Sequence, residues 1–102
     1  MTVKNFNGVK NQFVIERNGE VAFQSYDSTV CITYADGGMG YEKVVKLGKN
    51  WNYSTTTTKY LYRFLKEYGL ELLASKKAIE EAIARGHARL DESIAVIYDE
   101  TM

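Results

Sequence analysis

The sequence predicts an α+β domain in which a small antiparallel sheet, a meander of about four to five strands, carries two helices on one face. Apolar and polar residues alternate through the first half of the chain, which is the period of β-strands. After Gly48 the apolar residues recur every three or four positions, which is the period of an amphipathic helix. Elements that are apolar on one side must bury that side, so these two patterns predict helices packed on a sheet.

All 102 residues are expected to form this single domain. The chain is 45% hydrophobic and 13% aromatic, which is enough for one modest core. Its only cysteine, Cys31, cannot form an internal disulfide, in agreement with a reducing compartment. No apolar run is long enough to cross a membrane, and the first residues lack the features of a secretory signal. We therefore expect a cytoplasmic protein that does not associate with membranes.

The first strands are expected to flank a two-residue hairpin turn. Asn18-Gly19 separates two alternating segments, residues 12–16 and 21–23. Both turn residues tolerate positive φ angles, and Asn-Gly between alternating apolar runs is a strong hairpin signal. A short strand over residues 3–6 is expected before this hairpin, with a tight turn at residues 7–9 between them.

The hairpin strand at residues 12–16 has two sets of side chains that point to opposite faces of the sheet. One set contains Phe13 and Ile15, and the other contains Gln12, Val14 and Glu16. Either set can face the helices, and we expect the remaining set to meet solvent or a partner.

Two further strands are expected over residues 29–34 and 41–47, joined by the glycine-rich loop at residues 36–40. This loop matches neither the dinucleotide-binding nor the P-loop pattern, and it joins two strands rather than a strand and a helix. It is therefore interpreted as a hairpin loop. A last strand over residues 94–98 is expected to return to a sheet edge, with a terminal helical turn as the alternative.

The run of four threonines at residues 55–58 is expected to begin the first helix, over residues 55–68. Threonine is a poor interior helix residue, but Ser54 or Thr55 can accept a hydrogen bond from a free amide of the first turn. Gly69 can adopt the left-handed conformation that ends a helix. The residues expected on the buried side of this helix are Tyr60, Leu61, Phe64, Leu65 and Tyr68.

A second helix is expected over residues 75–85. Ser75 is its expected N-cap, and Gly86 follows as the stop signal. Its apolar side chains share the helical spacing of a buried face, and they are Ile79, Ala82 and Ile83.

Charge is unevenly distributed along the chain. Thirteen basic and thirteen acidic residues give a net charge of zero. Residues 43–89 nevertheless contain ten basic against four acidic side chains, whereas residues 90–102 contain four acidic side chains and no basic one. Such segregation is typical of proteins that contact nucleic acid or a charged protein partner.

The first helix carries the clearest candidate contact surface. Opposite its apolar side, Lys59, Arg63 and Lys66 form a cationic stripe with Tyr62 beside them. A helix with free amides at its start and cations along its outer face can contact phosphates. The simpler interpretation is a solvated helix face, and the zero net charge also argues against a dedicated nucleic-acid-binding domain.

Aromatic residues are more numerous than a core of this size easily buries. The chain has eight tyrosines, four phenylalanines and one tryptophan. Trp51, Tyr53 and Tyr62 are therefore candidates for partner contacts, because tyrosine and tryptophan often anchor protein interfaces. The alternative for Trp51 is packing at the junction of the sheet and the helix.

Few residues could support catalysis. His87 is the only histidine and follows Gly86, so it is expected at the surface. Cys31 alternates with its neighbours in a strand, and a nucleophilic thiol would need a lowered pKa. No spacing of histidine, cysteine or carboxylates matches a metal site. We expect no catalytic residues, no metal, no cofactor and no enzymatic activity.

Two segments carry a family resemblance, and they contain the patterns F-x-I-x-x-x-G-x-x-x-FQSY-x-S (residues 13–28) and W-x-Y-S-x-TT-x-KY-x-x-x-FL (residues 51–65), with SKKAIEEAI later. The sequence resembles a family of short uncharacterised proteins encoded by bacteriophages and other mobile elements of bacteria, over nearly its whole length. The resemblance implies binding to a component of the host. Inhibition of a defence system, as by anti-CRISPR proteins, is one such role, and the family offers no catalytic residues.

The leading hypothesis is therefore a non-enzymatic accessory protein that binds a host protein stoichiometrically and occludes it, with a defence nuclease complex as the expected target class. Its expected contact residues are Trp51, Tyr53, Lys59, Tyr62, Arg63 and Lys66. The second hypothesis is a nucleic-acid-binding module that uses Lys59, Arg63 and Lys66. A homodimer formed through a sheet edge at residues 3–6 or 94–98 is also open.

Overall fold

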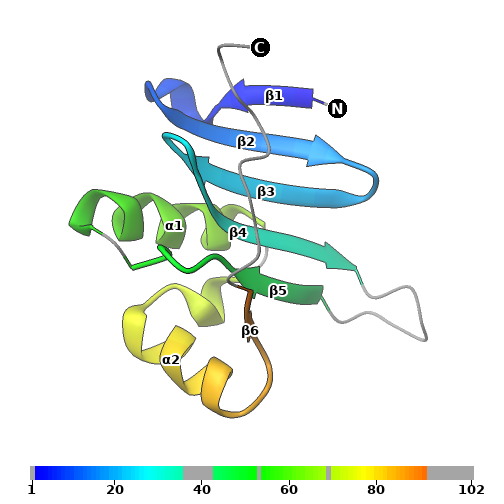
Figure 1. Cartoon of the computed structure of the whole chain (residues 1–102), viewed down its shortest axis with the longest axis vertical. Coiled ribbons are helices and arrows are strands. Elements are labelled where there is room, and N and C mark those ends of the chain that lie inside the picture. Colours follow the sequence, from blue (N-terminus) through cyan, green and yellow to red (C-terminus); the bar gives the residue numbers. More distant parts are fainter. Residues whose placement is uncertain (1, 36–42, 53, 69, 92–102) are drawn as a thin grey trace.

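The computed structural model in Figure 1 describes residues 2–35, 43–52, 54–68 and 70–91 of the chain. These residues form an α+β fold with a six-stranded sheet and two α-helices. Both helices share one buried cluster with one face of the sheet, and α1 contacts β3 and β4. The predicted fold class is confirmed, and the sheet is slightly larger than predicted.

The strands lie in the order β1-β2-β3-β4-β5-β6, so sequence order and spatial order agree. Their bounds are Thr2–Asn5 (β1), Gln12–Arg17 (β2), Glu20–Ser25 (β3), Ser28–Ala35 (β4), Lys43–Leu47 (β5) and Arg89–Leu90 (β6). The first five strands are antiparallel, whereas β6 runs parallel to β5. The predicted loop at residues 36–40 and the predicted strand at residues 94–98 lie outside the described residues.

The helices begin where the sequence predicts. Helix α1 spans Thr55–Glu67 and α2 spans Lys76–Ala84, with a short 3-10 helix, η2 (Glu71–Leu73), before α2. The hydroxyl oxygen of Ser54 accepts a hydrogen bond from the Thr57 amide at 3.1 Å, and Ser75 does the same for Ala78 at 3.2 Å. Within the described part of the chain, no helix is long and apolar enough to cross a membrane.

The cap on α1 leads to a prediction about stability. Replacing Ser54 with alanine removes the oxygen that accepts from the Thr57 amide, and that amide then has no partner within its own helix. We expect Ser54→Ala to lower the free energy of unfolding by about 0.5–2 kcal/mol. Urea unfolding checks this, with the exposed Thr56→Ala as control. A loss as small as that of the control would contradict a capping role.

The turns between the first strands use left-handed backbone conformations. Asn18 and Gly19 have φ angles of 45° and 80°, which confirms the predicted two-residue hairpin between β2 and β3. The tight turn after β1 is the 3-10 helix η1 (Phe6–Gly8), in which Asn7 has a φ angle of 52°. Helix α2 ends before Gly86, whose φ angle is 78°, as the stop signal predicts.

The two faces of the sheet differ from the expectation for a sheet with one solvated face. Val14 and Phe23 lie in the cluster that includes the helices. The opposite set, Phe13 and Ile15, is also buried, at 5% and 0% exposure. These two residues form a second cluster with Ala22 and Ile32, against which Val3 and Tyr34 pack. Of the two predicted alternatives for this second set, solvent or a partner, exposure to solvent is therefore wrong, since Phe13 and Ile15 are buried in a cluster of apolar side chains.

Aromatic rings form the centre of the contact between sheet and helix. The Phe64 ring of α1 stacks on the Phe23 ring of β3, with centroids 5.6 Å apart. The Phe6 ring of η1 meets both of these rings edge-on, at 6.4 Å and 5.8 Å. Tyr68 contacts Phe64 from the C-terminal side, at 4.7 Å. This packing fixes which side of α1 is buried and therefore which side is exposed.

Candidate functional site

The exposed side of α1 carries the predicted cationic stripe. Lys59, Arg63 and Lys66 are all exposed, while Leu61, Phe64 and Leu65 on the opposite side are buried. Among the described residues, none of the three cations forms an ion pair. We call these three residues the basic stripe. It presents positive charge to solvent on a helix held firmly by its other side.

Tyr60 anchors one end of this surface. The Lys59 ammonium lies 5.7 Å from the centroid of the Tyr60 ring, and the Arg63 guanidinium lies 5.5 Å from it. These distances are typical of cation–π contacts. The contacts with the ring restrict two long side chains that would otherwise move freely in solvent. Tyr60 is itself only half-buried and contacts the Phe6 ring edge-on. The sequence-based interpretation placed Tyr60 on the buried side and missed this role. The signal was available, because Tyr60 and Arg63 are three residues apart and side chains at that spacing are neighbours on a helix.

Tyr62 lies toward α2 rather than on the exposed stripe. It is half-buried and packs against the main core cluster. Burial, followed by the negative charge of Glu80 on α2, raises the pKa of its phenol. Tyr62 therefore contributes to the core and is not a freely exposed anchor. It lies at the margin of the surface that carries the basic stripe.

Trp51 belongs to the core and not to the exposed surface. It is only 5% exposed and lies in the cluster shared by the sheet and both helices. Its amide donates to the carbonyl of Gly48 at 3.1 Å, so the chain turns back after β5 and carries the indole inward. The expectation of an exposed partner anchor at Trp51 is therefore wrong, and the alternative, packing between sheet and helix, is confirmed. Tyr53, the other predicted aromatic contact, lies outside the described residues.

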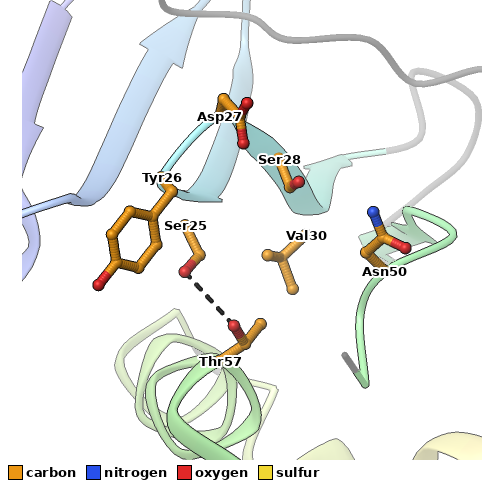
Figure 2. A pocket seen from close by; sticks show the side chains of 7 residues that line it. All are labelled: Ser25, Tyr26, Asp27, Ser28, Val30, Asn50 and Thr57. Atoms are coloured by element: carbon orange, nitrogen blue, oxygen red, sulfur yellow. Dashed lines mark hydrogen bonds between the residues drawn. The ribbon is translucent and has the colours of Figure 1, made fainter. Parts of the chain in front are cut away.

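A second surface feature lies at the start of α1, where the structure has a pocket of about 300 Å³. Figure 2 shows that its walls come from the turn between β3 and β4, from the segment after β5 and from the first turn of α1. We call it the turn pocket. It is lined by Ser25, Tyr26, Asp27, Ser28, Val30, Asn50 and Thr57.

Hydroxyl groups connect the turn to the helix at the buried end of this pocket. The Ser25 and Thr57 hydroxyl oxygens are 3.4 Å apart, and the dashed line in Figure 2 marks this contact. The Ser54 hydroxyl donates to the Thr57 hydroxyl at 3.0 Å. The helix start and the β3–β4 turn are therefore joined through side chains as well as through the core.

Tyr26 is held in an unusual backbone conformation at the rim of the turn pocket. Its φ angle is 55°, which is uncommon for a residue other than glycine. The conformation is fixed by two hydrogen bonds, because the Tyr26 amide donates to the Asn11 carbonyl at 2.7 Å and the Gln24 side-chain amide donates to the Tyr26 carbonyl at 2.9 Å. Tyr26 as a residue is 61% exposed, so the fold positions a large aromatic side chain that it does not bury.

The sequence-based interpretation did not identify the turn pocket. Its lining comes from two segments, residues 25–30 and residues 50–57, that are far apart in the chain. These segments overlap the two stretches that carry the family resemblance, and the structure brings them into contact. The serines and the acidic residue of the β3–β4 turn are the signal that could have drawn attention to it, but nothing local indicates that Thr57 lies opposite them.

Cys31 and His87, the cysteine and the histidine of the chain, do not lie together in a site. Cys31 is fully buried, and desolvation raises the pKa of its thiol to about 12. His87 is exposed, as predicted. In the described part of the chain, no group of three histidine, cysteine or carboxylate side chains could hold a metal ion. The buried thiol cannot form the thiolate that nucleophilic catalysis needs near neutral pH.

The buried thiol predicts a pH dependence of stability. Burial moves the pKa of Cys31 from 9.0 to about 12, so between these pH values the unfolded chain loses a proton that the folded chain keeps. Rising pH therefore favours unfolding, and the stabilising effect of the neutral thiol is complete below pH 9. Above pH 9, we expect the free energy of unfolding of the wild type to fall by about 1 kcal/mol per pH unit relative to that of Cys31→Ala. Urea unfolding of both proteins at several alkaline pH values measures it, and parallel pH profiles would contradict the prediction.

Comparison with known proteins gives a family of unknown function. No curated protein and no solved structure was found to match the chain. A sequence model of a protein family matches residues 1–81, which include all five antiparallel strands, helix α1 and the lining of the turn pocket. The description of that family is a family of unknown function, DUF8033. Because the match covers well over half of the sequence, the chain belongs to the DUF8033 family.

Proposed function

We propose that the protein is a non-enzymatic accessory protein of a bacteriophage or another mobile element that binds a host protein stoichiometrically through the basic stripe of α1. The expected target class is a defence nuclease complex, and the expected effect is occlusion of the bound surface. The observation that carries the proposal is the set of three exposed cations without ion-pair partners among the described residues. The phage context comes from the sequence resemblance.

The stripe suits an acidic surface on a partner. Charged groups that are unpaired in the free protein lose no internal ion pair when they meet opposite charges, and they accelerate association by electrostatic steering. Lys59 and Arg63 are partly ordered by the Tyr60 ring, so less side-chain entropy is lost on binding. The buried face of α1 fixes the backbone positions from which the three cationic side chains extend.

Capture of partners from a host lysate tests this proposal. The tagged protein is compared with a triple variant, Lys59→Glu, Arg63→Glu and Lys66→Glu, after nuclease treatment of the lysate. A matched control applies the same change of charge at exposed positions elsewhere, namely Lys10→Glu, Lys77→Glu and Arg85→Glu. We expect a stoichiometric host protein with the wild type and the control but not with the stripe variant. Equal capture by the stripe variant would refute the assignment of this surface.

Nucleic-acid binding is the second candidate function, and the same stripe supports it. If the three cations each contact one phosphate of duplex DNA, the binding constant should fall as salt concentration rises. A plot of the logarithm of the binding constant against the logarithm of salt concentration should have a slope of about −2.7. Binding titrations at several salt concentrations measure this slope, and the stripe variant should abolish it. Captured material that disappears after nuclease treatment would favour this function over protein binding.

A further inference from the structure

We propose that the turn pocket binds a neutral polyhydroxylated ring, that is, a free sugar or the ribose of a nucleoside. The proposal concerns a site separate from the basic stripe and goes beyond the function proposed above. It depends on the size of the pocket, on an unused hydroxyl proton at its buried end, and on the charge of its lining.

The pocket has the size and the walls for one small ring. Its volume of about 300 Å³ equals that of roughly ten water molecules and lies at the lower limit of ligand pockets. The exposed Tyr26 residue stands at one side with its aromatic ring (Figure 2), and the fully buried Val30 lies behind the polar lining. Apolar faces next to hydrogen-bonding groups fit a sugar ring, which has C–H groups on its faces and hydroxyls around its edge.

A proton count shows that the buried end of the pocket offers a donor. Thr57 already accepts from the Ser54 hydroxyl. Ser25 and Thr57 therefore have two hydroxyl protons but only one contact between them, at 3.4 Å, which is long for a hydrogen bond between hydroxyls. Neither of these two hydroxyl groups makes another hydrogen bond within the described part of the chain. Because these side chains are only 4% and 7% exposed, one buried O–H group lacks an acceptor unless the pocket supplies one.

The rest of the described lining offers acceptors and no positive charge. The Asp27 carboxylate accepts only, the Asn50 amide both donates and accepts, and the Ser28 hydroxyl does the same. No lysine, arginine or histidine is among the described residues that line the pocket. The lining therefore combines a buried donor with a negatively charged acceptor at the rim, where Asp27 is exposed.

This combination discriminates between classes of ligand. A phosphate or a carboxylate could accept from the buried hydroxyl, but it would face Asp27 without a neighbouring cation. An ammonium or a guanidinium group could donate to Asp27, but it has no acceptor for the buried hydroxyl. Each hydroxyl of a sugar both donates and accepts, so a single ring with adjacent hydroxyls satisfies both ends of the pocket.

The rim is fixed before any ligand arrives. The hydrogen bonds to Asn11 and Gln24 hold Tyr26 in its left-handed conformation, which is unfavourable for a residue with a side chain. Tyr26 and Asp27 therefore do not have to be ordered when a ring binds, and binding loses less conformational entropy.

An NMR titration of the full chain tests the proposal. The probes are D-glucose and D-ribose as free sugars, uridine as a nucleoside, methylguanidine as a cation and inorganic phosphate as an anion. We expect saturable shifts of the amides of residues 25–28 and 57 with the sugars or with uridine. Tighter binding of uridine than of ribose assigns the site to nucleosides, whereas tighter binding of a free sugar assigns it to carbohydrates.

Variants link the shifts to the pocket. Asp27→Asn and Ser25→Ala should each weaken binding by roughly tenfold or more, because the first replaces a charged acceptor with a neutral amide and the second removes a hydroxyl group from the pocket. Thr56→Ala, an exposed threonine of the same helix turn that does not line the pocket, should bind as the wild type does. Asp27→Asn keeps the size of an exposed side chain, so it remains informative if Ser25→Ala fails to fold. Saturable shifts with methylguanidine or phosphate alone, or with none of the probes, would overturn the proposal.

Discussion

Phe64→Ala is expected to lower the free energy of unfolding by about 3–5 kcal/mol, the largest loss from a single side chain of α1. Phe64 is fully buried, and its ring contacts those of Phe6, Phe23 and Tyr68. Removing it leaves a cavity at the point where η1, β3 and α1 meet. Small domains are commonly stable by only about 5–15 kcal/mol, so this variant should lie close to the limit of folding.

Urea unfolding monitored by circular dichroism measures this effect. The control is Lys66→Ala, which shortens an exposed side chain two positions away and should change stability by about 0.5 kcal/mol or less. A loss below about 2 kcal/mol for Phe64→Ala would mean that the surrounding rings close the cavity, and that the aromatic cluster is less tightly packed than described.

Gly48→Ala is expected to lower the free energy of unfolding by about 3 kcal/mol or more. This is the upper end of the usual cost of forcing extra atoms into a packed site. A β-carbon at this position would overlap the backbone carbonyl oxygen of Thr29 in β4. The Gly48 amide donates to the Val30 carbonyl at 2.9 Å, so the two backbones are held together and neither can move away without breaking that bond.

The matched comparison is Gly19→Ala, the same chemical change at a glycine with open space around it. Gly19 has a φ angle of 80°, so alanine there should cost only on the order of 1 kcal/mol from backbone strain. Thermal unfolding of both variants separates close backbone contact from backbone conformation. If Gly48→Ala were as mild as Gly19→Ala, the close contact between β4 and the segment after β5 would be refuted.

Local signals in the sequence were sufficient for most of the fold. The Asn18-Gly19 turn, the serine caps at Ser54 and Ser75 and the Gly86 stop each depend on residues within a few positions of one another. Short-range chemistry of this kind can be inferred from a single chain, because the hydrogen-bond partner or the required backbone angle is set locally. The helix faces followed from the same logic, and so the basic stripe was placed correctly.

Features that depend on distant segments could not be inferred in this way. The burial of Trp51 depends on how closely β4 approaches Gly48, and the turn pocket requires Thr57 to lie opposite Ser25. The pairing of β6 with β5 joins residues about forty positions apart, with only two residues in the strand. A two-residue strand has no detectable alternation, so its sequence contains no strand signal.

The burial of both faces of the central strands has a consequence for how the hairpin finds its alignment. In a strand with one apolar and one polar face, a shift by one residue exposes the apolar set and is strongly penalised. Here, Phe13 and Ile15 on one face and Val14 on the other are all buried, so a shifted β2 would still present apolar side chains to both sides. Discrimination against misaligned pairing of β2 with β3 must then come mainly from the Asn18-Gly19 turn, which sets which residues of the two strands lie opposite each other. In this sheet, hydrophobic burial provides cohesion, while a few backbone angles provide the accuracy of the alignment.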